Sequence, residues 1–123
     1  PMNIFKAKIS EDGKLLFSDN QVEINDKEVS ESLKPSHGKD ITIGIRPEFI
    51  KIEKKSSYTK GFESKVTNFE LLGAEALVHF KVDNQQVIAK TNAREVFDEE
   101  QYIVYHFDVK NIYFFDNETG NRI

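Results

Sequence analysis

Three histidines are the residues of this sequence best suited to bind a metal ion. His37, His79 and His106 stand far apart and have different neighbours. A zinc site needs ligands at short spacing, or ligands that converge with a carboxylate. His79 and His106 both fall in strand-like segments and could meet in space, but we expect them to be surface or rim residues. We therefore predict no metal site.

Carboxylates are a second kind of residue that could act in catalysis, and three of them form the run Asp98-Glu99-Glu100. A catalytic pair needs carboxylates that converge from separate segments, whereas a run of this kind is typical of a solvated face. The sequence also lacks the glycine-rich phosphate loop with its lysine and the nucleophile elbow of serine hydrolases. We predict no catalytic residue in this chain.

The aromatic residues are numerous, with ten Phe and four Tyr. Single-stranded nucleic acid binds to aromatic side chains that lie within a basic groove. Here the formal net charge is −4, and no basic stripe accompanies the aromatic residues. Core packing is the better interpretation for most of them, and Tyr58, Tyr102 and Tyr113 remain candidates for surface contacts.

Arg46 and Glu48 are two residues apart, so in an extended chain their side chains share one face. They form a surface ion pair worth about 0–1 kcal/mol, or they form a docking point for another domain, since an arginine fork suits carboxylate and carbonyl partners. The residue types alone do not decide between these alternatives.

The elements that position these residues are almost all strands. Alternating apolar residues predict strands at 3–9, 15–17, 22–24, 40–45, 50–52, 61–69, 76–82, 86–91, 102–107, 111–115 and 122–123. Only 29–35 has helical character, and 93–101 is ambiguous, with a short helical turn as one interpretation. Gly73 suggests a bulge or sharp bend. We predict an all-β fold for these 123 residues, as one domain or two small modules.

The segment 40–52 is the clearest strand signal, and Pro47 interrupts it. Proline lacks the backbone donor that a strand ladder needs, so the chain is expected to turn a corner here. No apolar run approaches the ~20 residues that span a bilayer, no signal-peptide pattern opens the sequence, and cysteine is absent. Because the sequence opens with Pro1-Met2, we expect a fragment of a longer protein.

Four stretches together resemble one known family: 1–5 (PMNIF), 44–48 (GIRPE), 66–75 (VTNFELLGAE) and 115–123 (FDNETGNRI). They are similar to motifs of the C-terminal domain in ATP-binding subunits of bacterial sugar importers, of the maltose/maltodextrin or glycerol-phosphate type. They follow the family's order and cover the whole chain. One departure is 99–101 (EEQ), where the family commonly has a glycine-aspartate turn.

The resemblance implies an OB-type barrel with an interleaved TOBE (MOP-like) β module. We divide the chain into OB-type strands at 1–52, an exposed connection at 53–60 and a TOBE-like module at 61–123. The implied role is regulation and dimerisation of the ABC transporter subunit. Candidate interdomain or interface residues are Arg46, Pro47, Glu48, Gly73, Glu75, Asp116 and Gly120.

The implied partners are the subunit's own nucleotide-binding domain, a second ATPase subunit and, indirectly, the membrane subunits. A phosphotransferase protein or a transcription regulator is a further candidate, and no nucleic acid is expected. We expect a cytoplasmic location at the inner face of the membrane. No cofactor is expected in this chain, because ATP and magnesium would bind the nucleotide-binding domain. Two alternatives are a small-ligand or oxyanion-binding TOBE module and an OB-type oligonucleotide binder.

Overall fold

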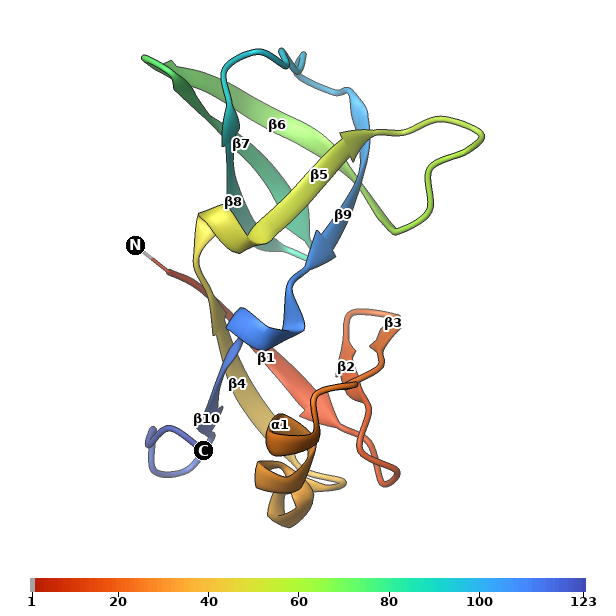
Figure 1. Ribbon diagram of the computed structural model, residues 1–123, viewed down its shortest axis with the longest axis vertical. Helices are drawn as coiled ribbons and strands as arrows, with labels where there is room; N and C mark the ends of the chain where they lie inside the picture. Colours follow the sequence, from red (N-terminus) through yellow and green to blue (C-terminus); the bar gives the residue numbers. More distant parts are fainter. Residues whose placement is uncertain (1) are drawn as a thin grey trace. The chain divides into compact units, whose positions relative to one another are not determined.

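The computed structural model describes residues 2–123, which form two compact units of almost pure β-structure (Figure 1). The terminal unit comprises residues 2–45 and 109–123, and the central unit comprises residues 46–108. Each unit contains one five-stranded antiparallel sheet. The prediction of an all-β fold is therefore confirmed. No helix in the described part of the chain is long and apolar enough to span a membrane.

The terminal unit has the strand order β10-β4-β1-β2-β3. Its strands are β1 (Asn3–Ile9), β2 (Leu15–Phe17), β3 (Asn20–Val22), β4 (Asp40–Ile45) and β10 (Tyr113–Asp116). Burial alternates strictly along β1, where Phe5, Ala7 and Ile9 face inward. This period of two is the reason that the sequence pattern located the strand correctly.

A short helix, α1 (Lys27–Ser32), and a 3₁₀ turn, η1 (Lys34–Ser36), connect β3 to β4. The Asp26 side chain caps α1 by accepting a hydrogen bond of 3.1 Å from the Val29 N–H. Leu33, between the two turns, is almost fully buried. The helical character predicted for 29–35 is confirmed.

The central unit has the order β5-β9-β6-β7-β8. Its strands are β5 (Ile50–Lys54), β6 (Phe62–Leu72), β7 (Glu75–Val82), β8 (Gln85–Asn92) and β9 (Tyr102–Phe107). Two 3₁₀ turns stand where the chain passes between the units, η2 (Pro47–Phe49) and η3 (Val109–Asn111).

Aromatic rings fill the core of the central unit. Tyr105 is 2 % exposed, and its ring centroid lies 5.7 Å from Phe62, 5.0 Å from Phe80 and 5.6 Å from Phe107. Such tilted ring pairs add roughly 0.5–1.5 kcal/mol each beyond their area burial. The core-packing interpretation of the aromatic residues holds for these four.

The two units do not follow the division predicted at 53–60. β10 pairs with β4, which places Tyr113–Asp116 in the sheet of the first strands, and β5 pairs with β9 in the other sheet. The predicted division cut the sequence at one place and so did not foresee these two pairings. The alternation of residues within a strand does not reveal which strand it pairs with. The 93–101 segment forms turns rather than a helix, and Gly73 lies in a hairpin, while the sheet irregularity falls between Val66 and Asn68.

Replacing Ile43 should destabilise the terminal unit strongly. Ile43 is fully buried in β4, which has partners on both sides. We expect Ile43→Ala to lower the free energy of unfolding by about 2–5 kcal/mol, because it leaves a cavity in a filled core. Urea denaturation measures this. Lys6→Ala, on the exposed face of the neighbouring strand, is the control and should stay within about 0.5 kcal/mol. Equal losses for the two variants would contradict the assigned core.

Candidate interaction site

The corner after β4 is built around Pro47. Arg46 is extended (φ −74°, ψ 147°), and the 3₁₀ turn η2 follows, with the Phe49 N–H donating to the Arg46 carbonyl at 3.0 Å. Proline fits the first position of such a turn because its φ is fixed and its missing donor is not needed there. The predicted corner is confirmed.

This turn changes the relation of Arg46 to Glu48. The two side chains would share a face only in an extended chain, so the expectation that they do is wrong. Among the ion pairs of the described residues, none joins them. Both residues are exposed, and the docking alternative stays a prediction.

Gly73 and Glu75 lie at the tip of the β6–β7 hairpin. Leu72 pairs with Glu75, so Gly73 and Ala74 form a two-residue loop, and Gly73 has φ +66°. Glycine at the first position of such a loop matches a type II′ turn. Glu75 also pairs with Asn92 on β8. The tip is exposed, with Leu71 and Leu72 at 59 % and 53 %.

Asp116 and Gly120 shape a turn of the terminal unit. The Asp116 carboxylate accepts hydrogen bonds from the backbone N–H groups of Glu118 at 2.8 Å and Thr119 at 3.0 Å. The Gly120 N–H donates to the Asp116 carbonyl at 2.9 Å, and Gly120 has φ +75°. The bonds from Thr119 and Glu118 hold the pKa of Asp116 below its ordinary value. These hydrogen bonds and the positive φ give Asp116 and Gly120 a role in shaping the turn.

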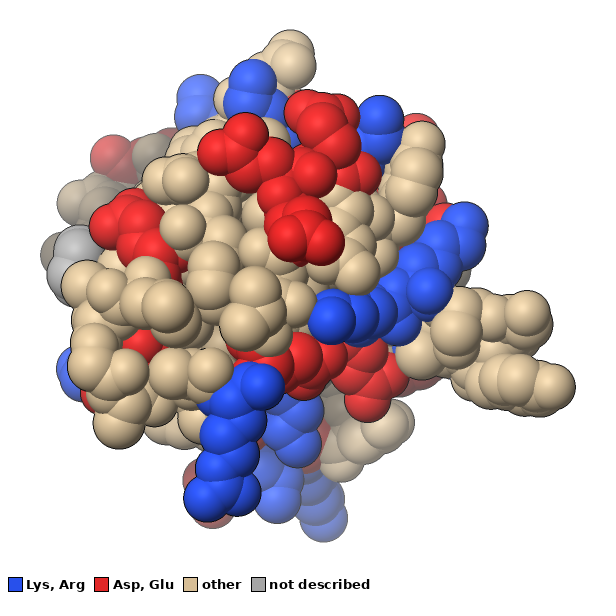
Figure 2. Space-filling view, turned by 90° about the horizontal axis from the view of Figure 1, so that it is seen from above, with Lys and Arg blue, Asp and Glu red and all other residues tan. Residues whose placement is uncertain are grey.

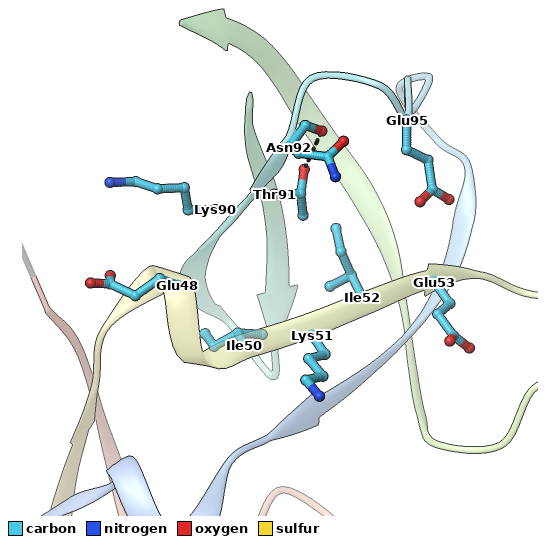
Figure 3. A pocket seen from close by; sticks show the side chains of 9 residues that line it. All are labelled: Glu48, Ile50, Lys51, Ile52, Glu53, Lys90, Thr91, Asn92 and Glu95. Carbon is cyan, nitrogen blue, oxygen red and sulfur yellow. Dashed lines mark hydrogen bonds between the residues drawn. The ribbon is translucent and has the colours of Figure 1, made fainter. Parts of the chain in front are cut away.

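A groove on the central unit contains one residue of the predicted set, Glu48. It is open, has a volume of about 260 Å³, and lies between β5 and β8 (Figure 3). Its lining residues are Glu48, Ile50, Lys51, Ile52, Glu53, Lys90, Thr91, Asn92 and Glu95. Glu48 stands at the η2 end. Asn92, at the other end, is the strand partner of Glu75. The corner therefore lies near one end of β8, and the hairpin tip lies near the other end.

The groove has an apolar floor and a charged rim. Ile52 on β5 is buried, while Glu48, Glu53 and Glu95 are exposed at the edge. Figure 3 draws Glu95 with its carboxylate turned toward the space above Ile52. The Thr91 hydroxyl donates to the Asn92 carbonyl at 3.4 Å. Two lysines, Lys51 and Lys90, also line the groove, so its rim is mixed in charge.

Of these groove residues, the sequence interpretation had selected only Glu48. Lys90, Thr91 and Asn92 come from one end of an ordinary strand, and Glu95 comes from a turn. Nothing in their spacing signals a site. They become neighbours of β5 because the sheet curls, which is a tertiary effect.

The histidines do not form a metal centre. His79 lies on β7, with its Nε2 2.7 Å from Glu70 Oε1, and this buried nitrogen makes no hydrogen bond. His106 lies on β9, and β6 separates the two strands. No cluster of three metal-binding side chains occurs among residues 2–123. His79 is half-buried, and His106 is exposed.

Tyr102 contacts two lysines on the surface. The Lys55 and Lys65 ammonium nitrogens lie 5.8 Å and 5.0 Å from its ring centroid. Its hydroxyl, with Glu100 nearby, raises the pKa of Lys65. Tyr58 is 93 % exposed, and Arg122 lies over Tyr113 at 4.6 Å. On the face seen in Figure 2, acidic groups lie between the basic ones, which is unlike a nucleic-acid groove.

Two family models cover most of the chain. A MalK OB fold domain matches residues 1–50, and a TOBE domain matches residues 43–115. The chain belongs to the TOBE domain family, here combined with a MalK-type OB fold domain. The resemblance seen in the four sequence stretches is thus confirmed.

The curated relatives are import ATP-binding proteins. The chain is 31% identical to the oligosaccharides import ATP-binding protein MsmX of Bacillus subtilis (strain 168), over 99% of this chain and 34% of that protein. It is 29% identical to the sn-glycerol-3-phosphate import ATP-binding protein UgpC of Pectobacterium atrosepticum, over 99% and 33%. The chain therefore spans about a third of the length of these relatives.

The fold also matches that of a solved structure, the cytoplasmic molybdate-binding protein ModG with molybdate bound. The TM-score is 0.73, at 14% identity, and the match covers 91% of this chain and 94% of that one. At this identity the likeness concerns the fold alone.

Asp116 should titrate below its ordinary pKa of 3.8. A depressed folded-state pKa adds stability that is present above the unfolded-state pKa and is lost as the pH falls through the folded-state value. We expect this loss below pH 3.8. Carboxyl NMR titration measures the pKa, and Asp116→Asn should remove this part of the acid dependence. An ordinary titration of Asp116 would contradict the assigned hydrogen bonds.

Substitution of Gly73 should reveal the strain of its positive φ. No atom lies within 4 Å of a Cβ added there, so only the backbone conformation opposes a side chain. We expect Gly73→Ala to cost about 1–2 kcal/mol in unfolding free energy, and Gly73→Asn to cost less because asparagine tolerates this region. Thermal melts compare the two variants, and equal losses would disagree with strain as the cause.

Proposed function

We propose that this chain is the regulatory and dimerisation domain of the ATP-binding subunit of a carbohydrate ABC importer. The observation that carries the proposal is the pair of family matches, a MalK OB fold domain followed by a TOBE domain. The named import ATP-binding proteins that match 99% of the chain add support.

The proposed role is non-catalytic in this chain. ATP and magnesium would bind a nucleotide-binding domain of the same subunit, and the chain would sit with it at the cytoplasmic face of the membrane. The partners in this proposal are that domain, a second copy of the subunit and, indirectly, the membrane subunits; a phosphotransferase protein or a transcription regulator is a further partner to test.

We assign the contact with these partners to the side of the central unit that carries Arg46, Pro47 and Glu48 at one end of β8, and Gly73 and Glu75 at the other. The exposed Arg46 guanidinium and the apolar hairpin tip support this choice. Asp116 and Gly120 belong to a separate turn, whose hydrogen bonds give them a structural role, and any interface there is a second proposal.

The two alternatives have less support. The molybdate named for ModG belongs to that protein, and at 14% identity it gives no ligand for this chain. An oligonucleotide binder would carry a basic footprint, whereas the net charge is −4. A titration with molybdate or sulfate and one with single-stranded DNA at low salt test these alternatives, and we expect no binding in either.

Arg46→Ala in the whole subunit tests the proposed function. Arg46 is exposed and makes no ion pair with Glu48, so its loss should change the unfolding free energy of this chain by less than about 0.5 kcal/mol. Loss of a charged hydrogen-bonding partner at an interface typically costs 2–5 kcal/mol. We therefore expect at least a tenfold loss of subunit dimerisation or of transport-coupled ATP hydrolysis.

Lys110→Ala, a basic residue outside this side of the central unit, is the matched control and should leave both readouts unchanged. Analytical ultracentrifugation measures dimerisation. If Arg46→Ala leaves assembly and transport normal, the docking role of Arg46 is refuted. A parent subunit that neither dimerises nor binds ATP would refute the proposed function itself.

A further inference from the structure

We propose that the central unit binds a second copy of this chain through two segments, a basic arm at 54–60 and an acidic turn at 95–100. The arm of each copy meets the turn of the other. We rest this inference on the proposed function, since it names a further contact surface for the dimer, separate from the side that carries Arg46. The observations behind it are an exposed aromatic side chain, two segments of opposite charge and their adjacency.

The basic arm connects β5 to β6 and extends away from both strands (Figure 1). It contains three lysines and no acidic residue, in a chain whose formal net charge is −4. At its tip the Thr59 N–H donates to the Ser56 carbonyl at 3.4 Å, and the Ser56 N–H donates to the Thr59 hydroxyl at 2.8 Å. Between these two residues, Tyr58 is 93 % exposed. The arm thus presents an aromatic ring to solvent on a hydrogen-bonded turn.

An exposed tyrosine in such a turn is well suited to anchor an interface. Its ring brings a large apolar area, and its side chain has only two rotatable angles to order on binding. The turn around it is already closed by hydrogen bonds, so little further ordering of the arm is needed. Tyrosine is among the residues that carry most of the binding energy at protein interfaces. We therefore assign Tyr58 as the apolar anchor of the contact.

The acidic turn lies beside the base of the basic arm. The Lys54 ammonium nitrogen is 5.6 Å from the centroid of the Phe97 ring, which belongs to the turn. The Lys55 N–H donates to the Tyr102 carbonyl at 3.0 Å, just after the turn. The turn carries no basic residue and four exposed carboxylates, those of Glu95, Asp98, Glu99 and Glu100.

Most charges of the two segments are not neutralised within the chain. Lys55 forms an ion pair with Glu63, and Glu100 forms one with Lys65. The ion pairs found among residues 2–123 leave out the other charged side chains of the arm and the turn, which are Lys54, Lys60, Glu95, Asp98 and Glu99. These side chains can pair with a partner without breaking an ion pair of the monomer.

A surface that carries opposite charges side by side is complementary to itself. In a two-fold dimer, a residue i of one copy contacts a residue j of the other, and j contacts i in return. One rotation therefore brings both basic arms onto both acidic turns, so each favourable contact is made twice. Charge complementarity of this kind steers association and fixes the register of the two copies. A second copy is thus the partner that fits the charges of this surface.

Sedimentation equilibrium of the chain tests the contact. At an ionic strength of about 0.01 M charges act over about 30 Å, and at about 1 M they act over about 3 Å, so we expect high salt to weaken the dimer at least tenfold. Tyr58→Ser should weaken it about tenfold or more, whereas Tyr58→Phe keeps the ring and should leave it nearly unchanged. A chain that stays monomeric at low salt and about 1 mM, or a dimer that Tyr58→Ser does not weaken, would overturn the proposal.

A charge exchange tests the pairing between arm and turn. Lys60→Glu and Glu99→Lys each place like charges opposite each other, so each variant alone should dimerise about tenfold more weakly. In an equimolar mixture opposite charges meet again at both contacts, and we expect a mixed dimer with the affinity of the unchanged chain. Lys8→Glu, exposed on β1 of the terminal unit, is the matched control and should change nothing. Absence of the mixed dimer would refute the pairing.

These outcomes are distinct from those of the proposed function. A whole subunit that dimerises normally with Tyr58→Ser but not with Arg46→Ala refutes the arm proposal alone. A subunit that neither dimerises nor binds ATP refutes the proposed function. Because Tyr58 and Lys60 are exposed, their substitution should leave the thermal melt of the chain unchanged, which separates lost association from lost folding.

Discussion

The pairing of β4 on both of its edges is the constraint on which the terminal unit depends. β4 hydrogen-bonds to β1 over six residue pairs and to β10 over four. Its inward residues Ile41, Ile43 and Ile45 are almost fully buried. Since β10 comes from the end of the chain, this pairing makes the terminal unit discontinuous, and the whole central unit is inserted between β4 and β10.

The corner at Pro47 follows from the same arrangement. The chain leaves β4 after Ile45, and β5 begins at Ile50 in a different sheet. Pro47 lacks a backbone N–H donor, so the β4 ladder ends before it. In the 3₁₀ turn that follows, residues two apart no longer share a face, as they would in a strand. This places Arg46 and Glu48 in solvent, and Glu48 lines the groove between β5 and β8. Arg46 and Glu48, which could form a surface ion pair in an extended chain, form none within the described residues.

β5 and β8 are the edge strands of the central sheet, and they approach each other although no ladder joins them within the described chain. Natural proteins usually protect such edges with charge, and Glu48, Glu53 and Glu95 stand where that protection is needed.

The sequence by itself determined the strands, the corner and the family. β1, β2 and β9 have the predicted bounds, because alternation of apolar residues is a local property that one strand carries alone. Pro47 and Gly73 likewise mark their turns through their own backbone restrictions. The pairing of β10 with β4 and the meeting of Glu48 with Asn92 and Glu95 were decided only in the tertiary structure. Strand partners and sheet curvature depend on contacts between residues far apart in sequence, which no period in the sequence encodes.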